Sequence, residues 1–203
     1  IRLWETATGK LLRVVTETDK IFMEGKSMLG KEDFSSITAA FSGDARYIAA
    51  SSLSNIPVVQ ETGSGKTVTT LEGISILMYH PRYSPDGNFF ATAGLKNNLR
   101  ADSKLSGVAN VWDTRSGKLA FSLAGHTGAV NELRFSKDSK WLVTFSQDST
   151  ARIWDVLTGK AIAAFGGHEK GVYNGFLTKD NKFLVTQTFS GLARIWDTES
   201  GNL

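Results

Sequence analysis

The sequence predicts an all-β protein assembled from copies of one strand-rich unit. The first observation is that Trp112, Trp154 and Trp196 are each followed by Asp and stand 42 residues apart. The second is that the segments between them alternate apolar and polar residues between turn residues, and none has the period and length of a helix. A fixed period of about 40–45 residues indicates a repeat array, in which each unit buries its apolar face against its neighbours. Such an array favours a binding scaffold over an enzyme.

A second mark divides each unit. Asp138 and Asp180 end turn sequences of similar type, and each follows the preceding Trp by 26 residues and precedes the next by 16. Related turn sequences end at Asp44 and Asp86. The interval of 16 residues counted from Asp44 leads to Gln60, so we expect a further unit to end there with Gln-Glu in place of Trp-Asp.

The residues around these marks favour strands. The segments 141–146 and 183–188 are rich in β-branched and aromatic residues. Residues 151–156 alternate and lead through a Gly-containing turn into another apolar segment, which is typical of an antiparallel hairpin. The three prolines, at 57, 81 and 85, fall at expected turns or strand starts.

Gly-His pairs complete the pattern. They occur at 125–126 and 167–168, and Trp154 and Trp196 follow the two histidines by 28 residues. With these residues the chain resembles the WD40-repeat β-propeller family over most of its length. The resemblance implies four-stranded antiparallel blades, with strands called a to d from the centre outward. In the best-marked unit these strands would be 129–135, 141–146, 151–156 and 161–165.

The resemblance implies a single partial propeller over 1–203, a segment of a larger ring. Strands c and d of one blade would occupy 1–16, and repeat units would end near 60, 112, 154 and 196. An open array leaves strand edges unpaired, which proteins avoid. We therefore expect the remaining blades to come from the same longer chain or from a second copy.

The resemblance also implies buried polar networks with a structural role. In one unit Asp148 would orient His126, His126 would reach Thr144, and Thr144 would meet the indole of Trp154. In the next unit Ser190 stands where Asp is expected. The full predicted structural set is His126, Thr144, Asp148, Trp154, His168, Thr186 and Trp196.

Two insertions interrupt the spacing, near 17–35 and 95–107. The first would connect strand d to strand a and the second strand b to strand c, which places both on one face of adjacent blades. Insertions on one face of a repeat array often form a binding surface. The candidate partner-binding residues are Phe22, Met23, Met28, Leu29, Lys96, Asn97, Asn98, Arg100 and Lys104. The apolar ones could equally fold back on the propeller, and the polar ones could form a solvated loop.

Composition excludes several other functions. The chain has no cysteine, which excludes disulfides and thiolate metal sites and suits the cytoplasm. No apolar run is long enough to cross a membrane. The net charge is only +3 without a basic cluster, so nucleic acid is not an expected partner. No catalytic or metal-binding motif occurs, and we expect no enzyme activity, no metal and no cofactor.

One segment imitates a nucleotide-binding loop. Residues 61–67 read ETGSGKT, but Gln60 stands where the first Gly of that motif belongs and a β-branched segment follows instead of a helix. The sequence thus predicts a non-catalytic scaffold that presents one propeller face to a protein or peptide. The alternative is the sensor or regulatory portion of a larger signalling NTPase or protease.

Overall fold

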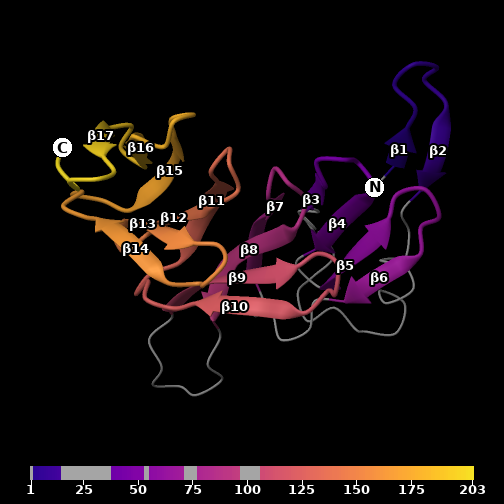
Figure 1. Ribbon diagram of the computed structural model, residues 1–203, viewed down its shortest axis with the longest axis horizontal. Coiled ribbons are helices and arrows are strands. Elements are labelled where there is room, and N and C mark those ends of the chain that lie inside the picture. The colour runs from indigo at the N-terminus through magenta and orange to yellow at the C-terminus, as the bar shows by residue number, and fades with distance from the viewer. Residues whose placement is uncertain (1, 15–37, 53–54, 71–76, 97–105) are drawn as a thin grey trace, which may run out of the picture.

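The computed structural model describes residues 2–14, 38–52, 55–70, 77–96 and 106–203. These residues form five antiparallel sheets and contain no helix. The sheets follow one another in chain order, from β1–β2 at the right of Figure 1 to β15–β17 at the left. The first and last sheets therefore lie at opposite ends of an open row.

Within each sheet, neighbouring strands are consecutive in the chain. The first sheet holds β1 (Arg2–Trp4) and β2 (Leu11–Val14). The second holds β3 (Thr38–Phe41), β4 (Tyr47–Ser52), β5 (Asn55–Glu61) and β6 (Thr67–Thr70). The third holds β7 (Leu77–Tyr83), β8 (Phe89–Lys96), β9 (Ser106–Asp113) and β10 (Leu119–Leu123).

The fourth sheet consists of β11 (Val130–Phe135), β12 (Trp141–Ser146), β13 (Ala151–Asp155) and β14 (Ala161–Phe165). The last consists of β15 (Val172–Leu177), β16 (Phe183–Thr188) and β17 (Ala193–Asp197). The strands of the fourth sheet begin and end within one residue of the predicted ranges. In this sheet the Trp-Asp and turn-Asp marks therefore locate the strands correctly.

The sheets are arranged as propeller blades. Their first strands, β3, β7, β11 and β15, pack side by side in that order, whereas the later strands of each sheet lie farther out. The fold is thus the predicted all-β segment of a β-propeller with four-stranded antiparallel blades. Its strands a to d are the first to fourth strands of each complete sheet.

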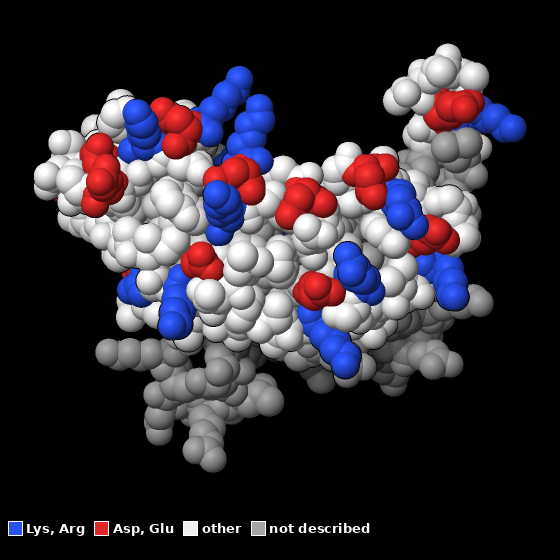
Figure 2. Space-filling model, in the orientation of Figure 1, with Lys and Arg blue, Asp and Glu red and all other residues white. Residues whose placement is uncertain are grey.

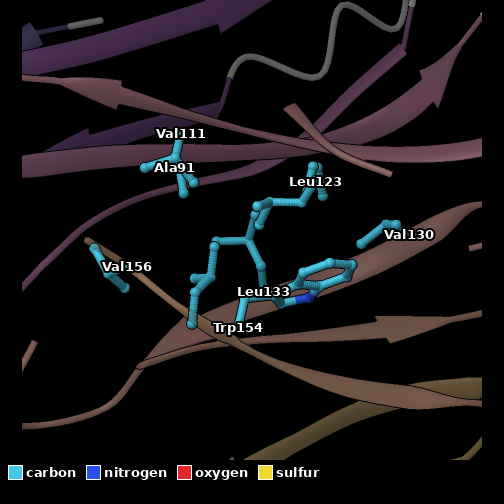
Figure 3. Packing of buried hydrophobic residues seen from close by; sticks show 10 residues of the cluster. Ala91, Val111, Leu123, Val130, Leu133, Trp154 and Val156 are labelled. Carbon is cyan, nitrogen blue, oxygen red and sulfur yellow. The ribbon is translucent and has the colours of Figure 1, made fainter. Parts of the chain in front are cut away.

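The hydrophobic core is divided among the junctions between sheets. Figure 3 shows Trp154 and Leu133 of the fourth sheet facing Ala91 and Val111 of the third. Trp112 packs in the same way against the second sheet, and Trp196 against the fourth. Because side chains alternate along a strand, each middle sheet contributes apolar residues to the junctions on both of its sides. In the third, fourth and last sheets, a Trp of strand c therefore joins the blade to the one before.

Backbone hydrogen bonds define two faces of the propeller. On one face, the turn between strands c and d donates to the turn between strands a and b; the pairs are Thr62 to Arg46, Thr114 to Asn88, Val156 to Lys140 and Thr198 to Lys182, at 2.7–2.9 Å. We call this the turn face. On the other, the loop face, the connection between b and c meets the connection leading into strand a, as where Gln147 N donates to Ala129 O at 2.9 Å.

The two predicted insertions fall between strands that end on the loop face. The first lies between β2 and β3, and residues 17–35 are outside the described residues. The second is shorter than the expected 95–107, because β8 and β9 continue as a paired hairpin in which Leu95 lies opposite Gly107 and Lys96 opposite Ser106. Cross-strand pairing makes β8 and β9 longer than β12 and β13, the corresponding strands of the fourth sheet. Only residues 97–105 separate them.

The segment that imitates a nucleotide-binding loop is a turn between strands c and d. Glu61 N donates to Lys66 O at 2.9 Å and Gly65 N to Glu61 O at 2.7 Å. The turn from Asp155 to Lys160 has the same two bonds, at 2.9 and 2.8 Å. Strand β6 follows, so no helix N-terminus is present there to bind a phosphate.

Candidate functional site

Most of the predicted partner-binding residues lie outside the described residues. They are Phe22, Met23, Met28, Leu29, Asn97, Asn98, Arg100 and Lys104. Lys96 is the last residue of β8, and its backbone lies opposite Ser106 of β9. The partner-binding set therefore stays a prediction, carried by the connections in which its members lie.

The fourth sheet brings four predicted structural side chains together. His126 Nδ1 lies 2.8 Å from Asp148 Oδ2, and His126 Nε2 lies 2.7 Å from Thr144 Oγ1. The indole N–H of Trp154 donates to Thr144 Oγ1 at 2.9 Å. These contacts connect the loop before strand a, strand b, the b–c turn and strand c. The network therefore ties strands b and c of one blade to the loop that leads into strand a.

The charges around His126 define which nitrogen carries its proton. Burial lowers the pKa of His126 below its usual 6.5, although the hydrogen bond to Asp148 opposes the change. Burial alone would raise the pKa of Asp148, but hydrogen bonds from Thr150 and His126 outweigh it and lower the pKa. At neutral pH the Asp148 carboxylate thus accepts from Nδ1–H. The unprotonated Nε2 accepts from the Thr144 hydroxyl.

The last sheet has a related network with a different acceptor. His168 Nε2 lies 2.8 Å from Thr186 Oγ1, to which the Trp196 indole donates at 2.9 Å. His168 Nδ1 lies 3.1 Å from the backbone oxygen of Ser149, in the b–c turn of the preceding blade. Ser190 instead exchanges a hydrogen bond with Thr188 Oγ1 at 2.8 Å. A backbone oxygen of the fourth sheet thus accepts from the histidine of the last sheet, as Asp148 accepts from His126 within the fourth sheet.

Two members of these networks, Thr150 and the backbone oxygen of Ser149, were not predicted from the sequence. Thr150 Oγ1 donates to Asp148 Oδ1 at 2.6 Å and lies 3.3 Å from His126 Nδ1. Its place two residues after the Asp is typical of a side-chain turn and could have indicated this role. The Ser149 oxygen belongs to the backbone of a residue with a positive φ of 67°. A backbone oxygen is present in every residue type, so the sequence does not indicate this acceptor.

The innermost strands make a further set of polar contacts that the sequence analysis missed. Arg82 of β7 reaches Glu132 of β11 at 3.3 Å, and Arg134 of β11 reaches Asn174 of β15 at 3.2 Å. Asn131 also donates to the backbone oxygen of Val172 at 3.0 Å. Polar residues on the inner edge thus link successive blades. The alternation of polar residues in otherwise apolar strands is the signal that could have found them.

Both signs of charge occur together on one face of the molecule. Figure 2 shows Lys and Arg side chains interspersed with Asp and Glu over the visible face. Among the described residues, no group of three or more His, Cys, Asp or Glu side chains could hold a metal ion. No helix within the described ranges has the length and apolar character needed to cross a membrane.

The family comparison matches the unit with the complete network. Residues 117–155 match the family model described as WD domain, G-beta repeat. The match runs from the turn before β10 to the Trp154–Asp155 pair, and proteins with such repeats generally serve as interaction scaffolds. No curated protein matches the chain. Residues 117–155 thus match a WD40 repeat, and the antiparallel sheets on both sides of this segment have the strand order of similar blades.

Proposed function

We propose that this protein is a non-catalytic scaffold that binds a protein or peptide partner on its loop face. The observation that carries the proposal is the chain topology. The connections between β2 and β3 and between β8 and β9 belong to neighbouring sheets and run between strand ends on that face. The connections of the fourth and last sheets are short by comparison. Length is therefore added where a partner can approach without disturbing the blades.

The turn face offers less freedom for variation. Its turns repeat one pattern of backbone bonds from sheet to sheet. Aspartates brace the same turns, as where Asp138 Oδ1 accepts from the Ser136 hydroxyl at 2.6 Å. A change of length in such a turn would break several hydrogen bonds at once. Partner specificity placed in the loop-face connections leaves these braces intact.

A capture experiment tests the loop-face proposal. In two variants, 17–35 and 97–105 are each shortened to the length of the corresponding connection in the fourth sheet. We expect partners captured by the original chain to be lost from one or both variants, while thermal unfolding is unchanged. A control carries Lys118→Gln and Lys160→Gln on the turn face and should retain the partners. Equal capture by all four proteins would overturn the proposal.

We further propose that another blade covers the free side of the last sheet. Ile195 is 58% exposed, whereas Ile153, at the same position of the preceding blade, is 1% exposed. Phe176, Val185 and Ile195 lie on neighbouring strands in one cross-strand row. A further blade of a longer chain or a second copy could bury this row. Concentration-dependent dimerisation in light scattering, lost in Ile195→Glu, would identify a second copy, and a monomer at all concentrations would favour a longer chain.

The proposal includes a cytoplasmic location. A chain without cysteine gains nothing from an oxidising compartment. Fractionation of cells that produce the tagged protein would test the location.

A further inference from the structure

A groove lies between the fourth and last sheets on the turn face. Its volume is about 820 Å³. Trp141, Ile162 and Ala163 line one side, and the turn residues 180–182 and 197–201 of the last sheet line the other. This face is opposite to the one proposed for the scaffold partner. The groove is therefore independent of the proposed function.

The preceding junction explains why space exists here. Between the third and fourth sheets, Phe121 of β10 and Val156 pack in the core, together with Phe89 at the start of strand b. An added methyl group on Gly159 would lie 2.5 Å from the Phe121 ring, so the ring fills the junction up to the turn. Phe121 is the counterpart, one repeat earlier, of Ala163 in the groove.

Two of the residues that fill the preceding junction have smaller or more polar counterparts in the groove. Ala163 replaces Phe121, and Thr198 replaces Val156. A methyl group added to Gly201, which corresponds to Gly159, would meet no atom within 4 Å. Trp141 replaces Phe89 and enlarges the aromatic surface. The junction that Phe121 fills between the third and fourth sheets is therefore open between the fourth and last sheets, beside the indole of Trp141.

The charges around this hole favour a cation. Asp180, Asp197 and Glu199 line the groove against a single basic residue, Lys182. The two aspartates accept their turn hydrogen bonds through Oδ1, so an occupant would meet Oδ2. Hydrogen bonds from Thr178 and from Ser200 lower the pKa of Asp180 and of Asp197, respectively, which keeps both ionised at neutral pH.

An arginine already lies against the aromatic ring at the equivalent position of the second sheet. Tyr47 occupies the first position of strand b in the second sheet, where Trp141 stands in the fourth. The guanidinium carbon of Arg46 lies 5.5 Å from the centre of the Tyr47 ring. Guanidinium groups stack on indoles at least as well and are weakly hydrated, so a planar cation suits the groove better than an ammonium group.

We propose that this groove binds an arginine side chain of a partner protein. The guanidinium stacks on Trp141 and meets the carboxylates of Asp197 and Glu199. Its aliphatic stem occupies the space that Phe121 fills in the preceding junction. The partner segment lies across the turn face, between the two outermost turns.

NMR titration tests the proposal with a defined probe, a capped Gly-Arg-Gly tripeptide. The indole N–H signal of Trp141, assigned through Trp141→Phe, should shift saturably. The same peptide with citrulline, which lacks the charge, should bind at least tenfold more weakly. Glu199→Gln should weaken binding about two- to fivefold, as expected for one exposed charge. Glu169→Gln, an exposed carboxylate away from the groove, should leave binding unchanged.

Filling the groove gives a second, independent test. Ala163→Phe restores the ring of the preceding junction, so we expect an equally or more stable chain that no longer shifts with the arginine peptide. If that variant does not fold, the citrulline and Glu199→Gln comparisons decide. Absence of a Trp141 shift, equal binding of citrulline, or tighter binding of a Gly-Phe-Gly peptide would overturn the proposal. The last result would make the groove a simple apolar hole.

Discussion

Arg82 and Glu132 form an ion pair across the junction between the third and fourth sheets. Nη2 of Arg82 lies 3.3 Å from both carboxylate oxygens. The Glu132 side chain is 8% exposed and that of Arg82 is 39% exposed, so the pair bridges the buried and open parts of the inner edge. The contact joins strands a of two blades that share no backbone hydrogen bond. Side chains alone therefore connect the blades at this point.

The ion pair gives a first prediction. Arg82→Gln should lower the free energy of unfolding by about 1 kcal/mol, since solvent screens the half-exposed guanidinium. Urea denaturation at low and high salt measures this, and the loss should shrink as salt rises. Arg115→Gln, in an exposed turn, is the control and should change stability by a few tenths of a kcal/mol. An equal loss in both variants would contradict a role for the pair.

The hydroxyl of Thr144 should be essential for stability. Thr144→Val keeps the shape but leaves Nε2 of His126 and the indole N–H of Trp154 without their shared partner. We expect unfolding to become easier by roughly 2–4 kcal/mol, because two buried polar groups lose hydrogen bonds. Thr70→Val, at an exposed position, is the matched control. Thermal and urea unfolding measure both, and equal midpoints would show that the network does not stabilise the blade.

The two network histidines predict a loss of stability in mild acid. Burial lowers the pKa of both His126 and His168 in the folded chain. Below about pH 6.5 the unfolded chain therefore binds protons that the folded chain does not, so stability falls as pH drops from 7 toward the folded pKa values. Urea midpoints at pH 7, 6 and 5 should fall in that order. A ring signal of His126 that titrates at an ordinary 6.5 would contradict the explanation.

Two equivalent glycines should respond differently to substitution. Gly159 and Gly201 have similar φ values, 67° and 73°. Gly201→Ala should cost only the backbone term, about 1 kcal/mol. Gly159→Ala should cost roughly 1–3 kcal/mol more, because the new methyl group meets the Phe121 ring. Equal losses in denaturation experiments would show that the ring moves aside.

The turn at 61–67, which imitates a nucleotide-binding loop, should not bind nucleotides. The original chain and Lys66→Ala should give the same baseline with ATP and Mg²⁺ in calorimetry, because strand β6 replaces the helix that such a site needs. A known P-loop protein serves as the positive control. Micromolar binding that disappears in Lys66→Ala would contradict the assignment of this turn.

The sequence predicted strand positions well where its marks are complete. Asp138 lies in the turn between β11 and β12, and Trp154 lies next to the end of β13, so counting between them locates β12 and β13 to within one residue. The extension of β8 to Lys96 was not predicted, because backbone pairing continues there without a change in side-chain pattern. Spacing gives the excess length of an insertion but not how it divides between strand and loop.

The site could be predicted only in part, for a physical reason. Each side-chain partner of His126 except Thr150 was predicted, because a side-chain network needs a particular residue type at each position. The acceptor for His168 is a carbonyl of Ser149, which every residue possesses. The groove beside Trp141 depends on a comparison between repeats, Phe121 against Ala163, and not on any motif within one of them.

The matched repeat and the blade are out of phase with one another. Residues 117–155 contain β10 of the third sheet and β11, β12 and β13 of the fourth. A fragment cut at the repeat boundaries would therefore separate each outer strand from the sheet that it completes. Cuts between sheets, near 124 and 166, would instead leave every sheet whole. By the same geometry, duplication of the 117–155 segment would add one blade and leave every sheet with a full set of strands.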